Sequence, residues 1–295
     1  MPEELREIFR DYQEGKISRR DFIGKAVLVT GSLAAAYSML GGTATDADAA
    51  VVASNDPDIL THNVEYQGKA GAVAAYLARP VKAGRYPAVV VIHENQGLTD
   101  HIRDVVRRVA KEGYVALAPD FLSRQGGTAK ANPKGGGLPN MRELAPWRTV
   151  AEDVASGFAY LNVLPDARSD KYGLVGFCWG GEMTFAAATQ IPTLDAAVVF
   201  YGRSPDPLDL IKEIKAPVMA HYGEKDPGVN KGIPDTIEAM KKYNRVYDHR
   251  IYPGAQHAFN NDTNAERYNA QAAKEAWGGN DGFLQEEFEG LISRS

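Results

Sequence analysis

From residue 63 onward, short apolar runs alternate with longer segments whose apolar residues recur at helical spacing. Residues 86–94, YPAVVVIHE, form a continuous apolar run, which is typical of a strand buried on both faces. Residues 99–113 then show apolar positions three and four apart, with Gly113 as a stop signal. Repetition of this alternation predicts an α/β fold with a mostly parallel central sheet and helices on both faces. The predicted strands are 63–67, 71–80, 86–94, 114–121, 171–178, 195–202, 216–223 and 247–253, and the predicted helices are 99–113, 148–164, 181–190, 232–244 and 285–292.

The composition fits one globular domain. The chain has 295 residues, 44% of them hydrophobic, and we predict a single domain over 51–295. A formal charge of −5 offers no basic surface, so nucleic acid is not an expected partner. The single cysteine cannot form an internal disulfide or a cysteine-based zinc site. A glycine-rich stretch at 123–140 predicts a loop, and the pattern defines neither its conformation nor the oligomeric state.

The first fifty residues differ from the rest. Arg19 and Arg20 stand directly before a moderately apolar stretch, 26–40, and Ala-Asp-Ala at 47–49 has the form of a cleavage site. The arginine pair is typical of a twin-arginine signal, so we expect residues 1–50 to direct export to a bacterial periplasm by the twin-arginine machinery. The apolar stretch is short for a stable membrane span. The alternative is an amphipathic helix that docks on the domain, and cleavage of the signal is left open.

The sequence GFCWGG at 176–181 ends one predicted strand and leads into the next helix. Its G-x-C-x-G spacing is that of a nucleophile elbow, a sharp strand-to-helix turn usually written G-x-S-x-G. Gly176 and Gly180 allow strand and helix to approach closely around a nucleophile in a strained backbone conformation. The amino terminus of the helix favours a thiolate. We therefore interpret Cys178 as a catalytic nucleophile rather than a small buried hydrophobic residue.

A nucleophile in such an elbow needs an orienting acid and a histidine base, which follow it in that order along the chain. His257 lies in a loop after the last predicted strand, at the edge where ligands bind. Asp226 directly follows the strand predicted at 216–223. We therefore predict that Asp226 orients His257 and that His257 activates the thiol. The alternative histidines are His221 and His249, which lie within predicted strands. The alternative acids are Asp195, which precedes its strand, and Asp206 and Asp209, which follow the 195–202 strand in weaker positions.

Two backbone N–H groups are candidates for stabilising negative charge on a substrate oxygen. Trp179 begins the helix after the elbow, and its N–H would point toward a developing oxyanion. Asn95 lies in the loop after the 86–94 strand, which supplies the second N–H in sites of this type. Glu94 at the same edge is a candidate for a buried carboxylate near the thiol. Its alternative is a helix-capping or structural carboxylate.

Five pieces of the sequence stand in one order along the chain. They are HENQGL at 93–98, EGYVALAPDFLSRQ at 112–125, GLVGFCWGG at 173–181, GEKDPGV at 223–229 and YPGAQHAF at 252–259. In this order they resemble the dienelactone hydrolase family of α/β-hydrolases, from about residue 60 to the end. The resemblance implies the α/β-hydrolase fold, a triad of Cys178, Asp226 and His257, and no metal or organic cofactor. It also implies that Glu94 pairs with the cysteine and helps form the thiolate when substrate binds.

The chain departs from the family where the substrate carboxylate is bound. The family's type enzyme has an arginine four residues after the histidine, and this chain has Asn261 there. A second carboxylate-binding arginine lies in the helix after the loop, where Arg142 or Arg148 stands. An asparagine amide cannot replace the charge of a guanidinium group. Arg142 and Asn261 are therefore the candidate substrate-binding residues, and the identity of the substrate is left open.

The function that these patterns favour is hydrolysis of a small ester or lactone through an acyl-cysteine intermediate. One alternative is a non-catalytic protein that binds a small molecule on a hydrolase fold. Another is a thiol-based redox sensor, although the chain has no second cysteine to resolve a sulfenic acid.

Overall fold

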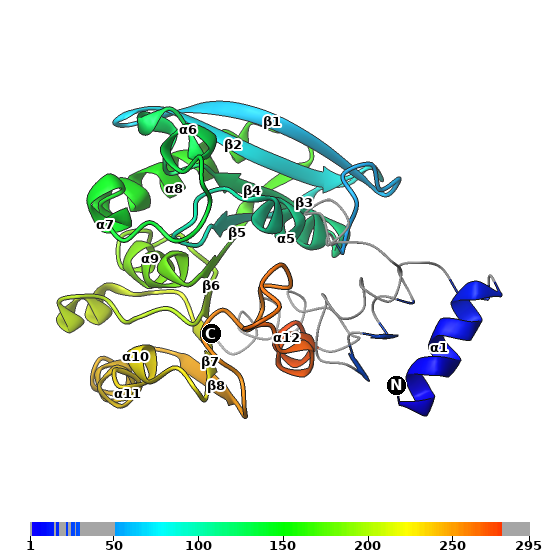
Figure 1. Ribbon diagram of the computed structural model, residues 1–295. Helices are drawn as coiled ribbons and strands as arrows, with labels where there is room; N and C mark the ends of the chain where they lie inside the picture. The colour runs from blue at the N-terminus through cyan, green and yellow to red at the C-terminus, as the bar shows by residue number, and fades with distance from the viewer. Residues whose placement is uncertain are drawn as a thin grey trace.

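The computed structural model describes residues 2–14, 16–17, 22, 25–26, 28–29 and 51–278. Its centre is an eight-stranded sheet with the order β1-β2-β4-β3-β5-β6-β7-β8 (Figure 1). β2 pairs antiparallel with β1 and β4, and all other neighbours are parallel. The predicted α/β-hydrolase fold with a mostly parallel sheet is confirmed. The strands are β1 (Ile59–Gly68), β2 (Gly71–Pro80), β3 (Tyr86–Ile92), β4 (Val115–Pro119), β5 (Ala167–Phe177), β6 (Ala196–Phe200), β7 (Val218–Gly223) and β8 (Tyr247–Tyr252).

The central strands read as continuous apolar runs because both faces of the sheet are covered. In β3, Ala88, Val90 and Ile92 belong to the core on one face. Val89 and Val91 belong to the core on the other face. Successive side chains of a strand point to opposite faces, so a strand covered on both sides is apolar at every position. The first face is covered by α8 (Trp147–Asn162), α9 (Trp179–Ala188) and α11 (Ile233–Lys242), and the second by α5 (Asp100–Lys111) and α12 (Ala270–Ala276) (Figure 1).

The ends of α5 follow the sequence signals. Thr99 occupies the N-cap position, although its side chain makes no capping hydrogen bond. Gly113 follows the helix with a φ of 94°, a left-handed conformation that suits glycine. The predicted hairpin turn between the first two strands is also present, because β1 ends at Gly68 and β2 begins at Gly71.

The glycine-rich stretch contains short helices that the sequence did not predict. It holds the 3-10 turn η1 (Ser123–Gln125) and α6 (Thr128–Ala131), and α7 (Met141–Leu144) follows it. Helices of three or four residues present no periodic pattern from which they can be recognised. The other short elements are the 3-10 helix η2 (Leu208–Glu213) after β6 and α10 (Pro227–Asn230) after β7. The helix predicted at 285–292 lies outside the described residues.

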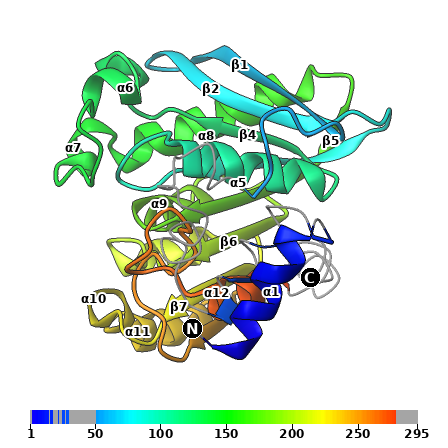
Figure 2. The same ribbon diagram turned by 45° about the vertical axis from the view of Figure 1, so that its right-hand side comes forward.

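The amino-terminal helix α1 (Glu3–Gln13) precedes the arginine pair. Leu5 is buried with Phe22 and Ala26 in a small cluster that also includes Tyr268, close to the start of α12. Figure 2 brings α1 to the front of the molecule. Most of the predicted signal, including the arginine pair and 30–50, lies outside the described residues, so the signal stays a prediction. Among the described residues, no helix combines the length and apolar character needed to cross a bilayer.

Candidate functional site

The turn after β5 carries Cys178 to the carboxyl edge of the sheet. A Cβ on Gly176 would overlap the carbonyl oxygen of Gly180. A Cβ on Gly180 would overlap the carbonyl oxygens of Ile92 and His93 at the end of β3. The two glycines are therefore required by the close approach of β5, α9 and β3, as the elbow motif predicted.

Backbone strain gathers at this edge. Cys178 has a φ of 57° and a ψ of −117°, which is the strained conformation expected of a nucleophile elbow. Tyr201 directly after β6 and Ala258 in the loop after β8 also have positive φ, at 41° and 64°. Such conformations cost about 1–3 kcal/mol each for residues other than glycine, and they concentrate at functional sites. The carbonyl of Phe200 holds Cys178 in place by accepting its N–H at 3.0 Å.

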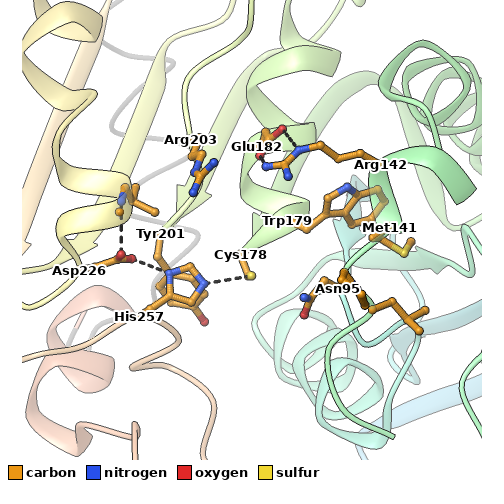
Figure 3. Close-up of a pocket in the computed structure, with 14 residues that line it drawn as sticks. Asn95, Met141, Arg142, Cys178, Trp179, Glu182, Tyr201, Arg203, Asp226 and His257 are labelled. Carbon is orange, nitrogen blue, oxygen red and sulfur yellow. Dashed lines mark hydrogen bonds and ion pairs between the residues drawn. The ribbon is translucent and has the colours of Figure 1, made fainter.

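Cys178, His257 and Asp226 form a continuous chain of hydrogen bonds (Figure 3). The Nε2 atom of His257 lies 3.0 Å from Sγ of Cys178, and its Nδ1 atom lies 2.5 Å from Oδ2 of Asp226. Oδ1 of Asp226 accepts the N–H of Val229 at 3.3 Å, because Asp226 is the N-cap of α10. The fold therefore brings together three predicted residues that follow β5, β7 and β8.

The imidazole of His257 is electrostatically biased toward its charged form. Burial lowers the pKa of His257, but hydrogen bonds with Asp226 and then Cys178 outweigh it and raise the pKa from 6.5 to about 10. At neutral pH the ring therefore carries its proton in this arrangement. A positive charge at 3.0 Å from sulfur favours the thiolate form of Cys178, which is the nucleophilic form of cysteine.

The two predicted oxyanion donors are free to bind a substrate. Within the described part of the chain, the backbone N–H groups of Trp179 and Asn95 donate to no other group. Trp179 is the first residue of α9, so its N–H has no acceptor within the helix. The Trp179 ring stacks on His93 with centroids 5.4 Å apart. Burial lowers the pKa of His93, which favours the neutral ring. Its Nδ1 lies 2.7 Å from the carbonyl oxygen of Glu94, to which it donates, so its Nε2 accepts the N–H of Phe121 at 3.2 Å.

Glu94 is buried, with 4% of its surface exposed. Its Oε2 accepts a hydrogen bond from the amide of Asn261 at 2.7 Å, whereas its Oε1 has no hydrogen-bond partner. The buried hydroxyl of Tyr201 also makes no hydrogen bond of normal geometry, although Glu94 is near enough to interact with it. Burial, and then the charge of Glu94, raise the pKa of Tyr201 well above its usual value. Glu94 thus stands in a polar pocket with Asn261 and Tyr201, and it makes no hydrogen bond to Cys178.

A cavity of about 230 Å³ opens at Cys178 and is lined by both predicted and unpredicted residues (Figure 3). Arg142 lines it and binds Glu182 through two hydrogen bonds, at 2.8 and 2.5 Å. Arg148 does not line it, because its guanidinium lies over the ring of Trp147. Asn261 also does not line the cavity. Its amide holds Glu94, which differs from the predicted contact with substrate.

Arg203 is a cavity residue that the sequence analysis missed. It lies three residues beyond the end of β6, and Figure 3 shows it between Asp226 and Glu182. It is exposed and makes no ion pair or hydrogen bond with any described residue. Arg142 has its charge compensated by Glu182, whereas Arg203 brings an uncompensated charge to the cavity. The rule that selected Asp226, a polar residue just past a parallel strand, would also have selected Arg203.

The weaker alternatives occupy other positions. His221 is fully buried in β7 and bonds to the hydroxyl of Tyr252 at 2.8 Å. His249 lies in β8, where its ring stacks on Tyr247. Asp195 binds the N–H of Tyr172 at the opposite, amino-terminal edge of the sheet. The remaining two aspartates, which are exposed and do not line the cavity, are Asp206 and Asp209.

Comparison with known proteins gives the family. The model of the dienelactone hydrolase family matches residues 73–288. A carboxymethylenebutenolidase candidate from Saccharolobus solfataricus is 34% identical over an alignment of 249 positions, which covers 74% of this chain and 95% of the relative. A second such candidate, from Synechocystis, is 37% identical over an alignment of 235 positions, which covers 75% of this chain and 94% of the relative. The crystal structure of a dienelactone hydrolase candidate from Klebsiella pneumoniae is 30% identical, has a TM-score of 0.70, and aligns over 78% of this chain and 98% of its own. The chain is therefore a hydrolase of the dienelactone hydrolase family.

Proposed function

We propose that this hydrolase cleaves an ester or lactone with Cys178 as nucleophile, His257 as acid and base, and Asp226 as the residue that orients the histidine. The observation that carries the proposal is the unbroken hydrogen-bond chain from Sγ through the imidazole to the Asp226 carboxylate. A nucleophile, a base and an orienting acid in contact are the general requirement for acyl transfer.

In the proposed first step, the thiolate attacks the carbonyl carbon and the carbonyl oxygen becomes negative. The N–H groups of Trp179 and Asn95 donate to that oxygen. When the tetrahedral intermediate collapses, the C–O bond breaks and the protonated His257 gives its proton to the departing alkoxide. For a lactone, the resulting alcohol remains part of the acyl group.

In the second step, His257 accepts a proton from water as the water oxygen attacks the thioester carbon. Collapse of this intermediate breaks the C–S bond and releases the carboxylic acid. Cys178 is thereby returned beside an imidazolium ring, ready for another cycle. Asp226 stays ionised throughout, because it holds the tautomer of His257 and stabilises its positive charge.

Glu94 is proposed to assist formation of the thiolate when substrate binds, as the family resemblance implies. In the substrate-free arrangement its carboxylate is held by Asn261. Its Oε1 is buried near the Tyr201 hydroxyl without a hydrogen bond, which costs free energy. A rearrangement that gives Oε1 a partner would therefore be favourable. Asn261 is accordingly proposed to position Glu94.

Arg203 is proposed to bind an acidic group of the substrate. The family's arginine after the histidine is replaced by Asn261, and Arg203 restores an unpaired guanidinium to the same cavity. A guanidinium group suits a carboxylate, because it can donate two parallel hydrogen bonds. A carboxylate-bearing ester or lactone is therefore the proposed substrate class.

Export by the twin-arginine machinery to the periplasm is a separate proposal, supported by the arginine pair and the apolar stretch after it. Changing Arg19 and Arg20 together to lysine should retain the full-length protein in the cytoplasm of a bacterial host. Equal periplasmic amounts of the parent and the variant after cell fractionation would overturn it.

The test of the enzymatic proposal compares hydrolysis of 4-nitrophenyl acetate and a small lactone panel by the parent protein and Cys178→Ala. Both proteins are checked for folding by circular dichroism. The proposal predicts turnover by the parent and its loss in the folded variant. Turnover that survives in Cys178→Ala would refute the cysteine mechanism. Binding of lactones with no turnover by the folded parent would instead favour the non-catalytic binding protein.

A further inference from the structure

A second cavity, of about 260 Å³, lies beside the cavity at Cys178. The two share a wall, because Arg142 and Glu182 line both. Either cavity alone is smaller than the roughly 300–1,000 Å³ of ordinary small-molecule sites, whereas the two joined would fall within that range. The division between them is therefore the feature that limits which substrates can fit.

The lining of the second cavity is mainly apolar. Trp147 from α8, Met183 from α9 and Leu210 from η2 supply its large side chains. The guanidinium of Arg148 lies 5.0 Å from the centre of the Trp147 ring and helps to hold that ring. A cavity of this chemistry and size suits an aromatic or branched aliphatic group.

The wall between the cavities is an ion pair that can open at low cost. The Arg142 side chain is 57% exposed, and its partner Glu182 is 18% exposed. Exposed ion pairs contribute only about 0–1 kcal/mol, because water and salt compete for both groups. Glu182 lies in the first turn of α9, which favours a carboxylate, whereas Arg142 lies on the four-residue helix α7. Arg142 is therefore the partner that moves most easily.

We propose that the two cavities are subsites of one substrate site, separated by a removable Arg142–Glu182 partition. The substrate then carries an apolar arm that extends from the carbonyl at Cys178 past the opened partition to Trp147. This inference rests on the proposed esterase or lactonase function and adds the apolar arm to its substrate class. It makes Arg142 and Leu210 determinants of specificity.

The kinetic test compares two pairs of esters, each with and without the arm. 4-Nitrophenyl 4-phenylbutyrate is paired with 4-nitrophenyl acetate, which tries the arm on the acyl side of the ester bond. 4-Phenylbutyl acetate is paired with butyl acetate, which tries the arm on the alcohol side. Leu210→Trp fills the second cavity, and Lys212→Trp is the matched control on the exposed side of the same 3-10 helix. Folding of each variant is checked by thermal unfolding.

The parent should show higher kcat/KM for at least one arm-bearing ester than for its short counterpart. Leu210→Trp should lower that preference about tenfold or more, as expected for loss of an apolar contact, while Lys212→Trp keeps it. Arg142→Ala, which removes the partition, should raise the preference. An unchanged preference in folded Leu210→Trp, or no preference in the parent, would overturn the inference.

A binding measurement separates failure of the subsite from failure of the enzyme. Titration calorimetry with Cys178→Ala compares 4-phenylbutyrate with butyrate, which lacks the phenyl group. Tighter binding of 4-phenylbutyrate that Leu210→Trp abolishes would support the subsite even if no ester were cleaved. Equal binding of the two acids together with turnover of 4-nitrophenyl acetate would refute the subsite and leave the proposed hydrolase intact.

Discussion

The two sides of the cavity at Cys178 are built in different ways. On one side, Cys178, Asp226 and His257 follow parallel strands, and main-chain hydrogen bonds hold the backbones of Cys178 and Asp226. On the other side, Leu138 and Arg142 come from a segment of turns and short helices. Leu138 is tied to the sheet edge through a hydrogen bond from its N–H to the carbonyl of Asn95. Arg142 is tied to α9 through its ion pair with Glu182.

This difference shows which part of the site needs a fixed geometry. Acyl transfer requires groups held in fixed geometry, and strand ends of a packed sheet provide it. Contacts with the remainder of a substrate need less exact geometry. Exposed segments can provide such contacts, because their sequence can change at little cost to the stability of the fold. Substitutions in the hydrogen-bonded chain of Cys178, His257 and Asp226 should therefore affect all substrates alike. Substitutions of residues that contact the rest of the substrate should change the ratio between substrates.

The largest expected effect comes from Gly176→Ala. Its methyl group would overlap the main chain of Gly180, so we expect a loss of roughly 3 kcal/mol or more in unfolding free energy and loss of activity on every ester. Gly232→Ala is the matched control, because a Cβ there would lie 3.6 Å from the carbonyl of Val229. Chemical denaturation measures both. A Gly176→Ala protein as stable as the control would contradict the close packing of the elbow.

The next largest effect is expected for Asp226→Asn. Without the carboxylate, His257 loses both its tautomer control and a main cause of its raised pKa, and kcat should fall by roughly 10³–10⁴. The NMR signals of the His257 ring give a second readout. In the parent they should titrate with a pKa of about 10, because the hydrogen bond with Asp226 raises the pKa of His257. In Asp226→Asn the pKa of His257 should be lower, and identical titration curves would argue against the ion pair.

A moderate, substrate-dependent effect is expected for Arg203→Gln. Loss of the unpaired guanidinium should lower kcat/KM for mono-4-nitrophenyl succinate about ten- to a hundredfold relative to 4-nitrophenyl acetate. Arg203→Lys, which keeps the charge, should retain part of the preference for the anionic ester. If Arg203→Gln left the ratio of the two esters unchanged, Arg203 would not bind the acidic group.

The smallest effect on stability is expected for Arg142→Ala. Because the side chain is 57% exposed, loss of its ion pair with Glu182 should change the unfolding free energy by less than about 1 kcal/mol. Thermal unfolding at low and high salt measures this, and the small difference from the parent should shrink as salt rises. A loss of several kcal/mol would mean that this side of the cavity is as firmly built as the sheet side.

The same contrast explains what could be predicted from sequence. The strands and long helices were recognisable because burial on two faces, or on one stripe, imposes a period on the residues. The elbow was recognisable because the close approach of strand and helix leaves no room for a Cβ at Gly176 or Gly180. Neighbouring strand ends then brought His257 and Asp226 within reach of the same edge.

Other features depend on contacts that sequence does not encode locally. The helices α6 and α7 are too short to show a period. Asn261 binds Glu94, which lies 167 positions away, and sequence reasoning did not anticipate this contact. Arg142 is paired with Glu182, whereas Arg203 in the same cavity is not. Which arginine is paired depends on where the fold places Glu182, so it could not be predicted from the sequence.

The most direct test of the account is to trap the acyl group on Cys178. The parent protein is mixed with 4-nitrophenyl acetate, quenched in acid during the first turnover, and digested for mass spectrometry. The account predicts one acetyl group on the peptide that contains Cys178, formed together with a burst of nitrophenol, and neither in Cys178→Ala. Turnover with an unmodified Cys178 peptide at every quench time, and equal turnover by folded Cys178→Ala, would contradict it.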